Sequence, residues 1–420
     1  MNTSLLNNQN LKRYRIGTHR TRSPADTLER ISPYLKEMGI TRVANVTGLD
    51  RLGIPVVVAV RPGSRSISVS QGKGHELEAA KASAIMESIE TWHAERIRLP
   101  LRYSSIEELR ADGLMIPEMD QLPRTSTIQL DDQTPIFWIE GRNLLDDQKV
   151  WLPREMVSTD YTLPEPPGTG YFAANTNGLA SGNTFDEAAC HAIFEVVERD
   201  ADALWRQSPV RDQHPRGVDT TTVNDPICQM ILSKFTDAGI EVGIWDVTTD
   251  AGIASFVCLV AGNATDWADP EFGAGCHSAR EVALARALTE AAQARTTFIA
   301  GSRDDIGAFL YRPEQRKRRQ NICTSLLKRH QPLRRFDAIA TYSDDNVSVD
   351  LNRTLENLRN IGIRQVLAVD LSLPAYNVAV VKIVIPGLEG AYGHHGENYI
   401  PGARARNVLS LPAALSDITS

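Results

Sequence analysis

The sequence predicts an α+β fold in which antiparallel-rich sheets pack against helices and one structural unit recurs. Two β-rich segments joined by a short polar connection are typical of a β-hairpin, and this pattern occurs at residues 43–60, 242–260 and 365–385. Three alanine-rich segments also follow Gly-containing segments that we interpret as loops, and each carries acidic or amide side chains three residues apart. Repeated hairpins and helices indicate internal pseudo-symmetry, whereas doubly wound folds alternate single strands with helices.

The length and the internal duplication together predict one structural unit. A chain of 420 residues is long enough for two or three domains. Because the repeated segments are spread along the whole chain, we expect a single interlocked unit over 1–420, with a core at about 60–405. The N-terminal segment 1–60 is expected to contribute a hairpin to this core, and a helix is expected from Pro24 to about Glu37.

Composition narrows the class of protein. The net charge of −7 and the sequence pI of about 5.8 argue against general nucleic-acid binding. The five cysteines form no C-x-x-C pair, which is typical of reduced thiols in a cytoplasmic protein. No apolar run is long enough for a membrane span, and the N-terminus lacks the apolar core of a signal peptide.

The three alanine-rich segments carry the chemistry. Side chains at i, i+4 and i+7 share one helix face, and the three sets are Ser83, Glu87 and Glu90; His191, Glu195 and Glu198; and Arg286, Glu290 and Gln293. Glutamates at helical spacing are most often a solvated face. Here apolar residues flank the acids, which favours burial, and buried carboxylates need partners. Converging carboxylates repel one another unless a cation lies among them, and oxygen ligands suit Mg²⁺. The sequence therefore predicts a magnesium–nucleotide site.

Other motifs are weaker. The run Gly72-Lys73-Gly74 is not a Walker A motif, and His394-His395 lacks the further ligands of a zinc site. The Pro-rich stretch 163–170 is a loop and a candidate flap over the site. Residues 312–335 hold nine basic side chains, which form either a solvated surface or a docking patch for an acidic peptide or partner. Cys276 is expected to be a small buried hydrophobe.

These helical motifs carry a resemblance to a known family. The patterns Ser83-x₃-Glu87-x₂-Glu90, Glu195-x₂-Glu198-Arg199 and Arg286–Gln293 resemble the three ATP-binding signatures of the YcaO family, from about Lys12 to Arg404. Segments 39–55 and 83–90 resemble most the YcaO proteins encoded beside a TfuA partner.

The resemblance implies a function and a set of site residues. It implies a YcaO-type fold and ATP-dependent activation of a backbone amide in a ribosomally synthesised peptide or protein. The implied Mg²⁺ ligands are Glu87, Glu90, Glu195 and Glu198. The implied nucleotide contacts are Ser83, Glu187, Arg199, Arg286, Glu290 and Gln293, with Arg20 and Lys73 as further candidates for the phosphates. No catalytic residue is assigned.

Two departures from the family pattern select the reaction. Thr91 follows Glu90 where the first signature usually has arginine, so Arg199 or Lys73 is expected to replace that phosphate contact. Residues 414–420 lack the Pro-x-Pro-x-Pro tail of many azoline-forming members, which favours thioamide formation with a TfuA-like partner that delivers sulfur. Two alternatives stay open: an azoline-forming cyclodehydratase with a separate leader-binding partner, and a non-catalytic ATP-binding accessory protein for ribosomal protein modification. We also expect a homodimer.

Overall fold

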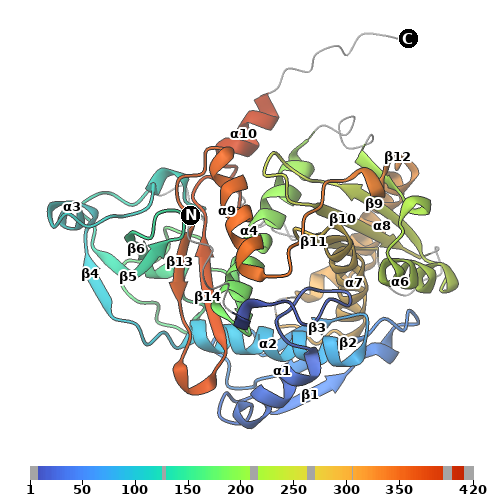
Figure 1. The fold of residues 1–420 in the computed structure, drawn as a ribbon, viewed down its shortest axis with the longest axis horizontal. Helices are drawn as coiled ribbons and strands as arrows, with labels where there is room; N and C mark the ends of the chain where they lie inside the picture. The colour runs from blue at the N-terminus through green and yellow to red at the C-terminus, as the bar shows by residue number, and fades with distance from the viewer. Residues whose placement is uncertain are drawn as a thin grey trace.

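The computed structural model describes residues 8–124, 129–208, 216–262, 270–304, 306–390 and 400–410. Its helices surround and separate several sheets (Figure 1). The helices are α1 (Pro24–Ile31), α2 (Leu77–Glu95), α3 (Ile106–Ala111), α4 (Phe185–Gln207), α6 (Pro226–Asp237), α7 (Arg280–Ala300), α8 (Pro313–Lys328), α9 (Val347–Asn360) and α10 (Ala403–Ser410).

The strands form three sheets. The first has the order β1-β2-β3, with β1 (Arg42–Asn45), β2 (Val56–Val60) and β3 (Val69–Lys73). The second has the order β11-β10-β9-β8-β12, with β8 (Gly217–Asp219), β9 (Glu241–Asp246), β10 (Ser255–Ala261), β11 (Glu271–Cys276) and β12 (Pro332–Arg335). The third has the order β4-β5-β13-β14-β7, with β4 (Leu101–Ser104), β5 (Ile136–Asn143), β7 (Leu179–Gly182), β13 (Leu367–Asp370) and β14 (Ala379–Val384), and with β6 (Lys149–Pro153) paired to β5.

The predicted α+β class is confirmed. Within the described part of the chain, only β8 and β12 pair in parallel, and the other strand pairs are antiparallel. The three expected hairpins form the pairs β1–β2, β9–β10 and β13–β14. None of the helices in the described ranges combines the length and the apolar composition that crossing a bilayer requires.

Each hairpin is extended by a third strand at a sheet edge, and that strand leads into one of the acidic helices. The units are β1-β2-β3 followed by α2, β9-β10-β11 followed by α7, and β13-β14-β7 followed by α4. In the third unit, β7 comes before its hairpin in the sequence: it ends at Gly182, whereas β13 begins only at Leu367. This order explains why only two of the hairpins run directly into an acidic helix in the sequence.

The Gly-containing segments that we expected to be loops are these third strands, so that expectation is wrong. The physical reason is close packing of each helix on its own strand. A Cβ added at Gly72 would lie 2.1 Å from the backbone nitrogen of Ala84. A Cβ at Gly275 would lie 2.1 Å from the carbonyl oxygen of Ala283, and one at Gly182 would lie 2.5 Å from the nitrogen of Ala188. Glycine in the strand and alanine in the helix therefore belong to one contact.

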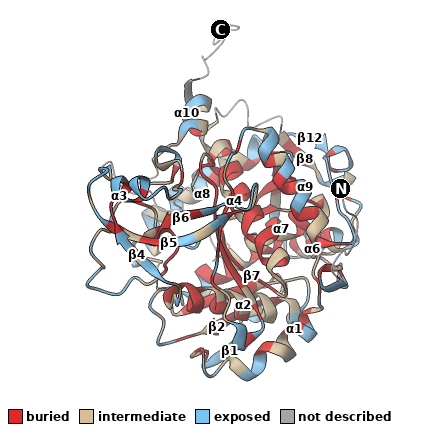
Figure 2. Cartoon of the chain, turned by 60° about the vertical axis from the view of Figure 1, so that its left-hand side comes forward, coloured by how far each residue is buried: buried red, intermediate tan, exposed pale blue. Residues whose placement is uncertain are grey.

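The three units close into a ring around a common centre. Besides its own strand, α2 packs against β7, α4 packs against β11, and α7 packs against β3. In Figure 1, α4 lies between the sheet containing β13 and β14 and the sheet containing β9–β11, with α2 crossing below. Buried residues concentrate on α2, α4 and α7 in Figure 2. The acidic faces of three helices therefore meet inside the molecule.

Two local expectations need correction or refinement. The helix expected from Pro24 forms, and Ser23 and Asp26 make a capping box at its start, but the α-helix ends at Ile31 rather than near Glu37. Pro33 falls in a following 3₁₀ turn, and proline cannot continue an α-helical hydrogen-bond ladder. The stretch 163–170 is irregular as expected. The carboxylate of Glu155 accepts hydrogen bonds from three backbone N–H groups of residues 170–172, which holds the end of this stretch in place.

Candidate functional site

Side-chain hydrogen bonds join each acidic helix to the neighbouring unit. Glu90 on α2 accepts hydrogen bonds from the backbone N–H and the hydroxyl of Ser181 on β7, at 2.7 and 2.6 Å. Glu198 on α4 accepts the N–H of Cys276 on β11 at 2.9 Å. On α7, Thr297 donates to the side chain of Gln71 on β3. These bonds follow the ring of units and bring the three faces together.

Burial changes the protonation of the carboxylates on α2 and α4. Loss of solvation raises the pKa of Glu87 to about 7 and that of Glu195 to about 7. It raises the pKa of Glu90 to about 8, and repulsion from Glu87 and Glu195 acts in the same direction. The pKa of Glu198 is raised by burial and by the charge of Glu290. The positive charge near these carboxylates is therefore too small to hold them fully ionised near pH 7.

Glu290 on α7 is different because cations surround it. Burial acts to raise its pKa, but the charges of Lys73 and Arg199 and a hydrogen bond from Lys73 lower it to about 2. Burial likewise opposes the charge of Arg199, yet Glu198, Glu290 and Glu195 hold its pKa above the ordinary value. Lys73 and Arg199 thus lie within the acidic cluster, and their role as replacements for the arginine missing at Thr91 stays a prediction.

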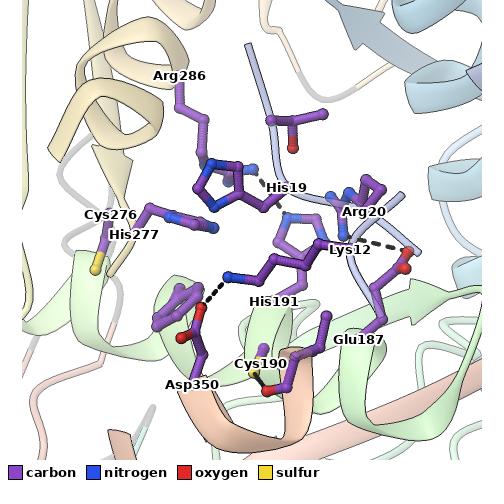
Figure 3. A pocket seen from close by; sticks show the side chains of 13 residues that line it. Lys12, His19, Arg20, Glu187, Cys190, His191, Cys276, His277, Arg286 and Asp350 are labelled. Carbon is purple, nitrogen blue, oxygen red and sulfur yellow. Dashed lines mark hydrogen bonds and ion pairs between the residues drawn. The ribbon is translucent and has the colours of Figure 1, made fainter. Parts of the chain in front are cut away.

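A cavity that is partly open to solvent lies beside this cluster, and six of its thirteen lining residues carry cationic or imidazole side chains (Figure 3). Arg286 donates a hydrogen bond to Nε2 of His191 at 3.0 Å, and its guanidinium lies 4.0 Å from Glu198. Its Nε is buried and has no hydrogen-bond partner among the described residues. Burial and the neighbouring cations lower the pKa values of His191 and His277, so both rings are neutral near pH 7. The cavity therefore offers an anion a donor, Nε of Arg286, that has no hydrogen-bond partner among the described residues.

The N-terminal segment closes one side of this cavity. Lys12 forms a buried ion pair with Asp350, and Arg20 approaches Glu187 to 3.7 Å (Figure 3). Oε2 of Glu187 accepts hydrogen bonds from the N–H and the hydroxyl of Thr21, at 2.8 and 2.7 Å. In the ligand-free chain, Glu187 thus anchors this segment, and a contact to nucleotide remains a prediction.

The remaining predicted residues have different surroundings. Ser83 and Gln293 are half-buried on α2 and α7. The hydroxyl of Thr91 accepts a hydrogen bond at 3.0 Å from Arg61, whose guanidinium also binds Glu95 through both nitrogens. A guanidinium therefore lies beside Thr91, but it is committed to Glu95.

Cys276 is buried, as expected, and burial raises the pKa of its thiol. The basic stretch 312–335 forms α8 and β12, and Arg319 within it binds Glu271 at 2.8 Å. His394-His395 and residues 414–420 lie outside the described residues.

The donor set fits Mg²⁺ in its chemistry. Glu87, Glu90, Glu195 and Glu198 supply oxygen atoms, which are the ligands that Mg²⁺ prefers, and their raised pKa values show that a cation is needed to hold them ionised. In the described part of the chain, no three His, Cys, Asp or Glu side chains are already grouped around one point as metal ligands. The carboxylates would therefore rearrange around an incoming ion.

Sequence reasoning missed two polar residues near this cluster. Lys382 on β14 is 2 % exposed, and burial lowers its pKa to about 8, while the charge of Glu195 acts in the opposite direction. Asn177 precedes β7 and keeps a buried side-chain oxygen. The signal for Lys382 was available, because it is the one charged residue in the apolar run 378–385.

Comparison with known families decides the assignment. The YcaO family model, described as a YcaO cyclodehydratase that binds ATP and Mg²⁺, matches residues 71–389. The chain belongs to the YcaO family. The predicted cofactors, ATP and Mg²⁺, are confirmed by this family assignment.

Relatives and solved structures agree with it. A Rhizobium leguminosarum bv. trifolii protein of the tfuA 3′ region is 36 % identical over 397 residues, covering 91 % of this chain and 93 % of that protein. A Methanothermobacter thermautotrophicus protein is 36 % identical over 372 residues, covering 87 % and 94 %.

Two solved structures share the fold at lower identity. YcaO from Methanopyrus kandleri, bound with AMPPCP and Mg²⁺, superimposes with a TM-score of 0.71 at 21 % identity, over 90 % of this YcaO chain and 95 % of that one. A heterocyclase in complex with substrate and cofactor gives a TM-score of 0.75 at 20 % identity. The match covers 90 % of this chain but only 53 % of the heterocyclase, so this chain spans about half of that longer protein.

Proposed function

We propose that this YcaO protein uses ATP to activate a backbone amide of a peptide or protein and converts it to a thioamide with a TfuA-like partner. The observation that carries the ATP-dependent step is the pairing of two features. Four carboxylates with raised pKa values, of which Glu198 is buried and the other three are half-buried, lie close together on α2 and α4. Next to them, the half-buried Arg286 has a buried Nε that has no hydrogen-bond partner among the described residues, and it lines a cavity that also contains Lys12 and Arg20.

The side chains divide the work by charge. We assign Mg²⁺ to Glu87, Glu90, Glu195 and Glu198, and the phosphates to the cations Lys73, Arg199 and Arg286, with Arg20 at the cavity wall. When bound, Mg²⁺ neutralises phosphate charge and orients the transferred group. The protein side chains position the phosphates and balance their charge, which is the main task in phosphoryl transfer. Ser83, Glu187, Glu290 and Gln293 complete the proposed nucleotide contacts.

The cysteines support the need for a sulfur-delivering partner. All five are buried, and none of them is in a disulfide bond. Burial raises the pKa of Cys190, Cys258 and Cys276 above the ordinary value, which disfavours the reactive thiolate. This chain therefore offers no accessible thiol to carry sulfur. The relative from the tfuA 3′ region supports a TfuA-like protein as that partner.

The test uses purified chain, Mg-ATP, sulfide and the TfuA-like partner with a candidate precursor peptide. We expect phosphate release that depends on the peptide, and a product about 16 Da heavier because sulfur replaces oxygen at the amide carbonyl. A product about 18 Da lighter would instead identify the azoline-forming alternative, in which a side chain adds and water is lost. ATP binding without phosphate release for any peptide would favour the non-catalytic accessory role.

A further inference from the structure

A second cavity reaches α4 away from the first. It is partly open to solvent and is bordered by residues just before β7, by α4 and by β14 with the segment that follows it. The two cavities reach α4 on different faces: Phe194 lines the first and Val196 lines the second. Because successive helical residues are about 100° apart, Glu195 lies between these faces. The second cavity is therefore adjacent to a proposed Mg²⁺ ligand without being part of the first cavity.

Eight of the twelve residues that line this second cavity are apolar, although polar atoms contribute at least as much of its surface as apolar atoms do. Its apolar side chains are Pro123, Met156, Ala173, Val196, Ile383, Val384, Ile385 and Leu388. Lys382 is its one cation, and Glu389 is its one acid. Glu389 is occupied, because its carboxylate accepts the N–H groups of Gly402 and Ala405 at 2.8 and 2.9 Å. A cavity of this kind suits a small, largely uncharged group better than a phosphate.

Two buried polar groups at this cavity can form further hydrogen bonds: Nζ of Lys382 as a donor and Oδ1 of Asn177 as an acceptor. Nζ of Lys382 is buried and donates to the carbonyl oxygen of Asn175 at 2.6 Å. Among the described residues this is its only hydrogen bond, and an ammonium group carries three N–H donors. Oδ1 of Asn177 is buried and has no partner within the described ranges. A buried polar atom without a partner is destabilising, which favours a ligand that supplies the missing hydrogen bond.

A backbone amide has the complementary groups. Its carbonyl oxygen accepts a hydrogen bond, its N–H donates one, and it carries no net charge. We propose that the second cavity is the subsite for the acceptor peptide, in which Nζ of Lys382 binds the carbonyl oxygen and Oδ1 of Asn177 binds the N–H of one peptide unit. The inference rests on the proposed function, since it places the amide beside Glu195 and the bound nucleotide. In this arrangement Lys382 would stabilise the negative charge that develops on the carbonyl oxygen when a nucleophile adds to the carbonyl carbon.

The experiment compares an amide probe with its ester analogue. N-methylacetamide carries a single peptide unit, and methyl acetate has an ester oxygen in place of its N–H; ligand-observed NMR with the Mg-ADP-bound chain measures their weak binding. The variants are Asn177→Leu and Lys382→Met, which keep the side-chain size, with Lys149→Met as control because Lys149 is 76 % exposed. Thermal melts verify that each variant is folded.

The expected result is a pattern across probes. Wild type and Lys149→Met bind the amide more tightly than the ester, by about fivefold to tenfold for one hydrogen bond of about 1–1.5 kcal/mol. Asn177→Leu removes this preference because the ester lacks only the N–H. Lys382→Met weakens both probes, by about tenfold, because it removes the donor to the carbonyl oxygen that they share.

Two outcomes overturn the inference. Equal binding of amide and ester by the wild type excludes the Asn177 contact. Unchanged probe binding by folded Lys382→Met excludes the Lys382 contact. In either case, Mg-ATP binding measured on the same wild-type sample shows whether the proposed nucleotide site still stands. Probe binding as expected, without peptide-dependent phosphate release for any peptide, would keep the subsite and contradict the proposed function.

Discussion

Glu87, Glu195 and Glu290 occupy equivalent positions on the three repeated helices, but they differ in charge. Burial raises the pKa of the first two to about 7, whereas Lys73 and Arg199 hold that of Glu290 at about 2. The local geometry is shared, because each helix packs an alanine face on a glycine of its edge strand. The difference comes from what lies opposite each carboxylate.

This comparison separates two roles within one repeat. On α2 and α4, Glu87, Glu90 and Glu195 form no ion pair among the described residues and are suited to a metal ion that arrives with the nucleotide. The carboxylate on α7 already has its cation, and it fixes Lys73 in the cluster through their ion pair. The repeated strand–helix unit thus builds the ring. The side chains next to each carboxylate, which differ between the units, determine whether it is paired with a cation of the protein.

The largest expected effect comes from removing the carboxylates that lack a partner. Glu90→Gln and Glu195→Gln should each weaken Mg-ATP binding by about tenfold or more, since hydrogen bonds and ligation by charged groups contribute about 1.5–3 kcal/mol. The melting temperature of the empty protein should stay the same or rise, because repulsion is relieved. Calorimetry and thermal melts measure both, with the exposed Glu356→Gln as control. Wild-type affinity in both variants would show that the ligands are misplaced.

Lys73→Met makes Glu290 resemble Glu87. Without the ammonium group, the pKa of Glu290 should rise and Mg-ATP binding should weaken, by less than for the carboxylate variants because Arg199 remains. The unpaired Glu290 should also lower the melting temperature. Adding Glu290→Gln should restore the melting temperature but not the binding. A double variant that stays destabilised would show that the loss of stability in Lys73→Met does not come from the unpaired charge of Glu290.

The pH dependence follows from the raised pKa values. Mg²⁺ requires ionised carboxylates, so Mg-ATP affinity should increase from pH 6 to about 8 as Glu87, Glu90 and Glu195 lose protons. In the ligand-free protein, the folded state holds these protons more tightly than the unfolded state. Their contribution to stability is therefore present at low pH and is lost as the pH rises from 4.5 toward 8. Calorimetry across this range, with Glu90→Gln for comparison, should show a smaller slope in the variant.

The smallest effect is expected at the basic stretch 312–335, which lies outside the three acidic helices. Lys317 and Arg318 on α8 are exposed, whereas Arg319 is bound to Glu271 and should be left unchanged. Lys317→Ser with Arg318→Ser should weaken binding of the TfuA-like partner or an acidic peptide a few-fold and reduce its salt dependence, with Mg-ATP binding retained. Equal affinity and equal salt dependence would mean that this stretch is only a solvated surface.

The sequence predicted those features that repeat and missed those created by folding. The hairpins and the acidic faces were predictable because periodicity and spacing are local. The strand identity of Gly72 and Gly275 was missed, since their reason is contact with a helix that follows. The hydrogen bond from Thr21 to Glu187, and the lack of a partner for Oδ1 of Asn177 among the described residues, depend on how distant segments pack together. The spacing of residues in the sequence cannot predict such contacts.

The central claim is that the carboxylates of α2 and α4 make nucleotide binding depend on the metal. The most direct measurement is the shift in melting temperature caused by ATP with Mg²⁺ and by ATP with EDTA, in wild type and in Glu90→Gln/Glu195→Gln. At about 100 times its Kd a ligand adds about 2.7 kcal/mol, a shift of a few degrees for a chain of this size. The account predicts this shift for wild type with Mg²⁺, and a much smaller shift with EDTA or in the double variant. An equal shift with and without metal in wild type would contradict it.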